Sequence, residues 1–230
     1  FELGRMDVVS DNEGQRAAPP AEMLRSGSYA TPTLNGRVYL AKPPLLYWTI
    51  AIVYAVTGYI NEWTARIPTA ACSLALVLCV YFAFRRRAGE GPARWTAIAL
   101  MASPYFLERS RWAELDVPLS LATFCCIMAS YAAWTAPSRR RRWVMAALSG
   151  VALAAGTLLK GPAPYLFLAA AFASFCVMEG GNPLGALRIG LKWTIVAFIV
   201  GWLFWWPLSV RFPVPAVLLA AVWGGLALWH

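Results

Sequence analysis

The chain has 230 residues, of which 60% are hydrophobic and only 13% are charged, and its net charge at pH 7 is +9. A soluble domain carries about 25% charged and roughly 45–50% apolar residues, so this composition excludes a soluble enzyme, a disordered tail and a disulfide-stapled secreted domain. The basic residues lie in short loops between apolar runs, which argues against nucleic acid as a partner and in favour of a membrane protein.

The first 43 residues are polar and rich in glycine and proline, as is typical of an irregular loop. We expect a short helix over residues 17–25 and a tight turn at Asn35-Gly36. Residues 44–60 are apolar but short, so hydropathy allows either a membrane span or an interfacial helix on the outer leaflet. Composition leaves both alternatives open.

Apolar segments follow one another through the rest of the chain, and a membrane span needs about 20 such residues. Because a helix satisfies its own backbone in hydrocarbon, we predict an all-α, multi-pass transmembrane helical bundle. We divide the chain into an extracytoplasmic loop unit with juxtamembrane helices at 1–60 and a helical bundle at 61–230. The expected spans are 64–84, 94–108, 116–135, 143–159, 163–178, 191–210 and 214–229.

The charge of the loops predicts how these spans are oriented. The loops at 85–94, 137–142 and 179–192 hold 10 of the 20 Lys and Arg residues, with only Glu90 and Glu179 beside them. By the positive-inside rule these loops are cytoplasmic. The opposite, extracytoplasmic face therefore receives nearly every carboxylate of the chain.

The chain begins at Phe1 rather than at a methionine and stops within an apolar run, so we expect a piece of a longer polypeptide, truncated at both ends. The five cysteines lie in apolar runs without metal-ligand spacing, and the only histidine is His230. We therefore predict that the cysteines are small core side chains and not part of a zinc site. A divalent cation between outer carboxylates stays open.

The ionisable side chains gather at the outer ends of the apolar segments, and charges that persist in lipid usually mark function. Acids beside bases suit a transfer reaction on a phosphate-bearing lipid. A carboxylate takes the proton from an acceptor hydroxyl, and Lys and Arg hold the phosphate leaving group. The outer groups form four clusters: Asp11, Glu13 and Arg16; Lys42; Glu108, Arg109, Arg111, Glu114 and Asp116; and Lys160 with Arg66.

Simpler roles exist for the same residues. Glu13 can be a solvated loop acid, Lys42 an interfacial lysine, and Asp116 the N-cap of a helix. Arg109, Arg111 and Glu114 can form a structural salt-bridge cluster, since Arg111 and Glu114 are three residues apart if a helix continues there.

A transporter or lipid flippase without transferase activity is the alternative function. Such a protein needs an ionisable or Gly/Pro-broken element at mid-depth, and often an internal repeat. The sequence shows neither feature, so it favours a catalytic site at the membrane surface.

Several runs match a known pattern between about residues 8 and 165: NEGQR at 12–16, EMLRSG at 22–27, TPTLNG at 31–36, YLAKPPLLYW at 39–48, EWTARIP at 62–68, DVPL at 116–119 and LLKGP at 158–162. The chain thus resembles the GT-C membrane glycosyltransferases. The resemblance is strongest to the glycosyltransferase family 39 group, which contains the lipid A aminoarabinose transferases and the protein O-mannosyltransferases.

The resemblance implies an all-helical GT-C fold that transfers a sugar from a polyprenyl-phosphate donor to a lipid, glycan or protein acceptor. It implies a bacterial inner-membrane protein whose active site faces the outside, with membrane lipids as further partners and no certain cofactor. It also makes residues 44–60 a juxtamembrane helix and implies a first span before Phe1.

Site residues follow from the same resemblance. The acidic pair of the family falls on Asn12-Glu13, with Asn where the family has Asp, so Glu13 is the first choice for the base and Asp11 the second. Lys42 is expected to contact the phosphate, and Asp116 to orient the acceptor, a lysine or a metal. The further substrate-binding residues that the resemblance implies are Arg16, Tyr47, Arg66 and Lys160.

Overall fold

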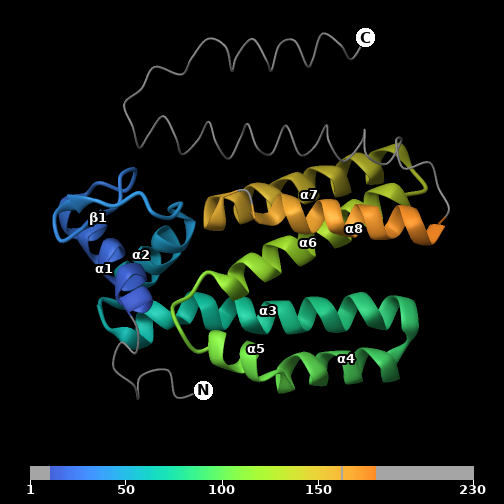
Figure 1. The fold of residues 1–230 in the computed structure, drawn as a ribbon, viewed down its shortest axis with the longest axis horizontal. Helices are drawn as coiled ribbons and strands as arrows, with labels where there is room; N and C mark the ends of the chain where they lie inside the picture. The colour runs from blue at the N-terminus through green and yellow to red at the C-terminus, as the bar shows by residue number, and fades with distance from the viewer. Residues whose placement is uncertain (1–10, 162, 180–230) are drawn as a thin grey trace, which may run out of the picture.

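A computed structural model of the chain describes residues 11–161 and 163–179 (Figure 1). The expected spans at 191–210 and 214–229, together with His230 and the side chain of Asp11, lie outside this part. The described elements are α1 (Asp11–Ser26), a two-stranded hairpin of β1 (Thr33–Leu34) and β2 (Arg37–Val38), α2 (Leu45–Thr57), α3 (Glu62–Ala88), α4 (Glu90–Ala102), α5 (Pro104–Arg109), α6 (Asp116–Trp134), α7 (Arg139–Lys160) and α8 (Ala163–Glu179).

Helix α1 is longer than the helix that we expected at 17–25, because it begins at Asp11 and continues through Pro19 and Pro20. A proline inside a helix removes a backbone donor and is normally disruptive. Both prolines are fully buried in this structure, so their packing offsets the lost hydrogen bonds. As a result Glu13 is held on a helix and not in a loop.

The hairpin is fixed to α1 by one carboxylate. Its turn is Asn35-Gly36, as the sequence predicts, and both residues have positive φ, which suits a two-residue hairpin. The Glu22 carboxylate accepts hydrogen bonds from the Thr33 hydroxyl at 2.5 Å and from the Asn35 and Gly36 amides at 2.6 and 3.3 Å. One side chain of α1 therefore holds both the first strand and the turn.

This anchor predicts a pH-dependent hairpin. The hydrogen bond from Thr33 and those from the turn amides lower the pKa of Glu22 below its ordinary 4.5. A carboxyl with a lowered folded-state pKa stabilises the fold fully above its unfolded pKa and loses that contribution as the pH falls through the folded value. We expect protease cleavage within the hairpin to accelerate below about pH 4.5, and cleavage of Glu22→Gln to be fast at every pH. Equal cleavage of the parent protein at pH 7 and pH 3 would contradict the anchor.

Helix α2 is too short to cross a bilayer by itself. It has 13 residues and ends at Gly58, whose φ is 72°. At about 1.5 Å per residue it is roughly 20 Å long, against a hydrocarbon core of about 30 Å. The length favours the interfacial alternative for residues 44–60 over a membrane span.

Three described helices are long and apolar enough to span a membrane: α3 with 27 residues, α6 with 19 and α7 with 22. The expected span at 94–108 is instead divided into α4 and α5 at Ser103-Pro104, because Pro104 cannot donate to the preceding turn and disfavours helical geometry at Ser103. Helix α7 begins at Arg139 rather than at residue 143, so the arginine run forms its first turn.

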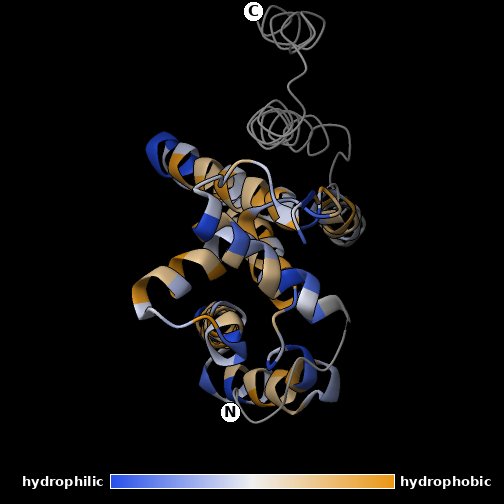
Figure 2. Cartoon of the chain, turned by 90° about the vertical axis from the view of Figure 1, so that its left-hand side faces the viewer, coloured by the Kyte–Doolittle hydropathy of each residue, from blue (hydrophilic) through white to orange (hydrophobic). Residues whose placement is uncertain are grey.

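A buried apolar core packs α1 and α2 against the long helices at one end of the bundle. Its buried members come from α1, α2, α3, α6, α7 and the loop before α6: Ala21, Leu46, Ile50, Tyr54, Ala65, Ala113, Leu115, Ala122 and Leu159. Figure 1 shows α1, α2 and the hairpin at this end, while the α3–α4 and α6–α7 connections lie at the opposite end. Figure 2 faces the first end and shows hydrophilic stretches beside strongly hydrophobic helices.

The close packing of α7 against α8 depends on one glycine. A Cβ atom added at Gly156 would lie 2.8 Å from Cγ of Pro164, and the rigid ring of Pro164 cannot turn away. We expect Gly156→Ala to cost about 1–3 kcal/mol through overpacking, measured as a lower unfolding temperature in detergent. Gly91→Ala is the matched control, because a Cβ at Gly91 meets no atom within 4 Å. Equal unfolding temperatures for the two variants would contradict this packing.

Candidate active site

A buried ion pair joins α1 to α3. Nε of Arg66 donates to Oε1 of Glu13 at 2.7 Å, and Nη2 donates to Oε2 at 2.9 Å. Both residues are only 2% exposed, and the Ala113 amide also donates to Oε1 of Glu13 at 3.0 Å. The helix that carries Arg66 begins in a reciprocal cap between Asn61 and Thr64. This two-pronged pair is a strong charge-assisted contact that fixes three parts of the chain.

Glu114 forms the second charged contact of this end. Its carboxylate lies 3.9 Å from Nη2 of Arg16 and 3.7 Å from Nη1 of Arg109, and its carbonyl accepts a hydrogen bond from the Thr69 hydroxyl at 3.2 Å. The Arg109 guanidinium also lies 5.3 Å from the ring centre of Trp112. Two positive side chains thus share one carboxylate, and both ion-pair distances are long.

Several buried donors of α1, α2 and α5 have no hydrogen-bond partner among the residues that the structure describes. They are Nε and Nη1 of Arg16, the hydroxyl of Tyr47 and Nε of Arg109. Arg16 is 5% exposed and Tyr47 is 1% exposed. Burial raises the pKa of Tyr47 to about 12, although the charge of Arg16 opposes the shift, so the phenol stays a neutral donor. Because buried polar groups are normally satisfied, these donors are suited to hold an acceptor-rich anionic group.

A third contact pairs the ends of α6 and α7. Nζ of Lys160 donates to Oδ1 of Asp116 at 2.8 Å, and the Tyr105 hydroxyl donates to Oδ2 at 3.2 Å. The side chains of Lys160 and Asp116 are 39% and 28% exposed. The Tyr105 ring lies 5.3 Å from the guanidinium of Arg109, which connects this pair to the arginines around Glu114. Asp116 is therefore a carboxylate that a substrate can reach.

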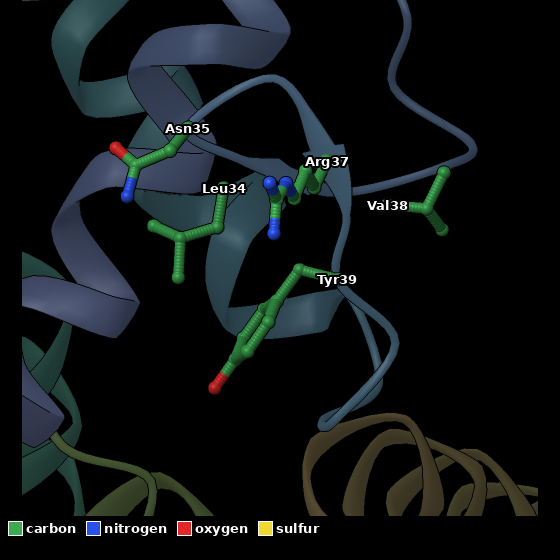
Figure 3. A pocket seen from close by; sticks show the side chains of 5 residues that line it. All are labelled: Leu34, Asn35, Arg37, Val38 and Tyr39. Atoms are coloured by element: carbon green, nitrogen blue, oxygen red, sulfur yellow. The ribbon is translucent and has the colours of Figure 1, made fainter.

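The hairpin adds an open pocket of about 430 Å³, lined by Leu34, Asn35, Arg37, Val38 and Tyr39 (Figure 3). The hydroxyl of Tyr39 donates to the side chain of Gln15 at 2.7 Å, one residue before Arg16 on α1. Lys42 is partly buried in the loop that leads to α2. Across the described residues no ion pair involves Lys42.

The short segment 113–116 brings these contacts together. Its first residue donates to Glu13, its second pairs with Arg16 and Arg109, and its last pairs with Lys160. The predicted residues Glu13, Arg16, Arg66, Asp116 and Lys160 thus gather at one end of the bundle. Tyr47 is close enough to Arg16 for the arginine charge to lower the pKa of its phenol.

The Arg109–Glu114 ion pair of the expected salt-bridge cluster is present, whereas the Arg16–Glu114 ion pair and the Tyr105–Asp116 hydrogen bond were not predicted from the sequence. The salt bridge expected between Arg111 and Glu114 was wrong: α5 ends at Arg109 and α6 begins at Asp116, so no helix continues there, and Arg111 is exposed. The acidic run Glu114-Leu115-Asp116 before Val117-Pro118 was the available signal. This run could not indicate that Glu114 pairs with arginines whereas Asp116 pairs with Lys160.

Metal ligation finds no support in this part of the chain. Among the described residues, no three His, Cys, Asp or Glu side chains lie close enough to hold a metal ion. The chemistry that the described groups can supply is proton transfer by a carboxylate and binding of an anion by Arg, Lys and Tyr donors.

Comparison with known proteins gives the family. Residues 41–208 match the family described as dolichyl-phosphate-mannose-protein mannosyltransferase. An uncharacterized protein of Aquifex aeolicus is 27% identical over 205 residues, which are 89% of this chain and 40% of that protein. An undecaprenyl phosphate-alpha-4-amino-4-deoxy-L-arabinose arabinosyl transferase of Shewanella sediminis is 28% identical over 69% of this chain and 29% of its own length. The corresponding transferase 2 of Pseudomonas fluorescens is 30% identical over 87% and 34%.

The fold agrees with this family. ArnT from Cupriavidus metallidurans in the apo state superposes with a TM-score of 0.80 at 24% identity, over 92% of this chain and 40% of that one. The same protein bound to undecaprenyl phosphate gives 0.79 over 93% and 39%. The chain spans 29–40% of the lengths of these relatives. The all-α, multi-pass membrane fold and the predicted resemblance are therefore confirmed, and the chain belongs to the dolichyl-phosphate-mannose-protein mannosyltransferase family of GT-C membrane glycosyltransferases.

Proposed function

We propose that the protein transfers a sugar from a polyprenyl-phosphate donor to an acceptor on the extracytoplasmic face of a bacterial inner membrane. The observation that carries the proposal is the group of charged side chains around segment 113–116, at one end of an otherwise apolar bundle. Its relatives of known activity are named for undecaprenyl-phosphate-linked aminoarabinose, and an ArnT neighbour binds undecaprenyl phosphate. A lipid phosphate at a membrane surface fits cationic donors placed at such an end.

The donor phosphate is assigned to the unsatisfied donors. Three buried atoms, Nε and Nη1 of Arg16 and the hydroxyl oxygen of Tyr47, have no hydrogen-bond partner in the described part of the chain. Lys42 lies on the loop before the helix that carries Tyr47. When the bond between the anomeric carbon and the phosphate oxygen breaks, its electron pair stays on the phosphate. Fixed cations and donors stabilise that growing negative charge.

Asp116 is the proposed base among the carboxylates whose side chains the structure describes. It would accept the proton of the acceptor hydroxyl as the hydroxyl oxygen forms its bond to the anomeric carbon, with Lys160 and Tyr105 keeping the carboxylate oriented. A base role for Glu13, our first choice from the sequence, requires its ion pair with Arg66 to open. Glu13 and Arg66 are therefore proposed to position the site.

The orientation and the division of the chain belong to the same proposal. Residues 1–60 would form an extracytoplasmic cap, with α2 along the membrane surface, on a bundle that begins at residue 61. Support comes from the short α2 and from the arginines gathered at the opposite end of the bundle, which the positive-inside rule assigns to the cytoplasm.

Donor binding tests the assignment of the phosphate. We expect Arg16→Met to weaken undecaprenyl-phosphate binding to the purified full-length protein by about tenfold or more, since one charged hydrogen-bonding group is typically worth on the order of 1.5–3 kcal/mol. Lys42→Met is expected to weaken binding in the same direction. Arg25→Met is the matched control, because Arg25 is exposed at the end of the same helix. Unchanged binding by both Arg16→Met and Lys42→Met would overturn the phosphate assignment.

No observation in the described residues favours a transporter or a lipid flippase. The charged residues of α3, α6 and α7 lie near the ends of these helices, whereas transport sites usually lie near mid-depth. Lipid flux in proteoliposomes without any sugar transfer would support that alternative over a transferase.

A further inference from the structure

The end of the bundle opposite to the candidate active site carries a dense positive charge. We call it the arginine rim, and it consists of Arg85, Arg86, Arg87, Arg94, Arg139, Arg140, Arg141 and Arg142. The first three end α3, Arg94 lies in α4, and the last four begin α7. Figure 1 places the α3–α4 and α6–α7 connections at this same end, and the Arg87 guanidinium lies 4.7 Å from the ring centre of Tyr131 on α6. Two stretches far apart in the sequence, 85–94 and 131–142, thus meet at one surface.

Most of this charge has no counter-charge within the described residues. Glu90, the carboxylate of the α3–α4 connection, pairs with Arg94 at 2.6 Å. The other seven arginines form no ion pair in the described part of the chain, and all of them are exposed. The charge is therefore available to an external anion.

The arginine run forms the first turn of α7, a position at which the helix dipole disfavours positive charge. Unpaired backbone N–H groups give the first turn a partial positive charge that attracts anions and repels cations. Here the first four residues are all arginines, and only Ser138 caps the helix, accepting from the Arg141 amide at 3.3 Å. Self-repulsion and the helix dipole both oppose this arrangement, so an anion bound across the turn would relieve both.

The aromatic side chains beside the arginine rim indicate the depth at which such an anion would bind. Trp134 and Trp143 flank the rim, and each is about half exposed. Trp and Tyr side chains are enriched at the depth of lipid head groups. Aromatic side chains beside exposed arginines are the pattern expected at the level of lipid phosphates.

We propose that the arginine rim binds the head groups of anionic phospholipids, such as phosphatidylglycerol. The guanidinium groups of the first turn of α7 and of the end of α3 hold the phosphates, whose geometry suits two-pronged contacts from arginine. The aromatic side chains border the same surface. This binding requires only insertion in a membrane and is independent of the proposed sugar transfer.

Native mass spectrometry of the detergent-purified, full-length protein tests the proposal. The protein is mixed with equal amounts of phosphatidylglycerol and phosphatidylcholine that differ in acyl mass. We expect phosphatidylglycerol adducts to dominate, and the double variant Arg140→Gln/Arg141→Gln to reduce them about tenfold, since each arginine near a lipid surface contributes to the attraction. The conservative double variant Arg140→Lys/Arg141→Lys is expected to retain most of the preference.

The matched control removes the same charge elsewhere. Arg25→Gln/Arg37→Gln takes two exposed arginines from the opposite end and is expected to leave the lipid preference unchanged. Equal retention of the two lipids by the parent protein would overturn the proposal. So would an equal loss in the two glutamine variants, because it would reflect net charge and not this surface.

Discussion

Replacing Arg66 with alanine is expected to lower the free energy of unfolding by about 3–5 kcal/mol, because it leaves the buried Glu13 carboxylate without its charged partner. Both residues are 2% exposed, so water cannot replace the lost contacts. The same carboxylate also accepts from the Ala113 amide, and its displacement would disturb the segment that carries Glu114. Chemical denaturation in detergent, followed by tryptophan fluorescence, measures the change.

Two further variants separate charge burial from a general loss of packing. Arg111→Ala removes an exposed arginine at the same end and is expected to change stability by less than about 0.5 kcal/mol. The double variant Glu13→Leu/Arg66→Met is expected to be more stable than Arg66→Ala, because replacing both buried charges with apolar groups removes the unpaired one. A double variant that is less stable than Arg66→Ala would contradict this account of the pair.

The second large effect concerns the chemistry and not the fold. Asp116→Asn is expected to reduce sugar transfer by about 10²–10⁴-fold, the usual contribution of a positioned acid or base. The fold should survive, because the side chains of Asp116 and Lys160 are 28% and 39% exposed, and partly exposed ion pairs contribute only about 0–1 kcal/mol. Transfer by the purified full-length protein and its unfolding temperature are measured together.

Ser120→Ala provides the control for this variant. The Ser120 hydroxyl donates to the main-chain carbonyl of Asp116 at 2.8 Å and is exposed one turn along the same helix, so its removal leaves the carboxylate in place. We expect nearly full transfer activity. Transfer by Asp116→Asn at the rate of the parent protein would show that Asp116 is not the base. Glu13 and Asp11 would then be the remaining candidates.

Sequence patterns predicted the features that depend on neighbouring residues or on the solvent. The Asn35-Gly36 turn follows from the freedom of these residues to adopt positive φ. The apolar segments that became α3 and α6 follow from hydropathy, and the gathering of acids at one end follows from loop charge. The turn, the apolar helices and the gathering of acids each depend on local sequence, and the structure contains all three.

The pairings within the site could not be predicted in the same way. Arg66 is 53 residues from Glu13, and Glu114 pairs with Arg16 on α1, so only the packing of α1 on α3 and on segment 113–116 brings them together. Local sequence predicted Arg109 and Arg111 as partners of Glu114, and of these two only Arg109 forms an ion pair with it among the described residues. The burial of each carboxylate also could not be predicted from composition. Glu13 is buried in its ion pair, which favours a positioning role, whereas the Asp116 side chain is partly exposed, which favours a reactive role.

The beginning of α1 shows a conflict between local and tertiary effects. The helix expected at 17–25 left Glu13 outside it, and it placed Pro19 and Pro20 close to its start, where proline is tolerated best. In the structure the buried prolines and the ion pair with Arg66 stabilise a helix from Asp11. Tertiary contacts outweighed a local preference of the backbone here.

Mass spectrometry of lipid-linked sugars tests the central claim most directly, in cells that lack the gene for this protein. If the charged group around segment 113–116 transfers a sugar from polyprenyl phosphate, then a polyprenyl-phosphate sugar accumulates in the deletion strain. The parent gene should clear the accumulated sugar, and the Asp116→Asn gene should not. An unchanged profile of lipid-linked sugars in the deletion strain, or clearance by the Asp116→Asn gene equal to that by the parent gene, would contradict the account.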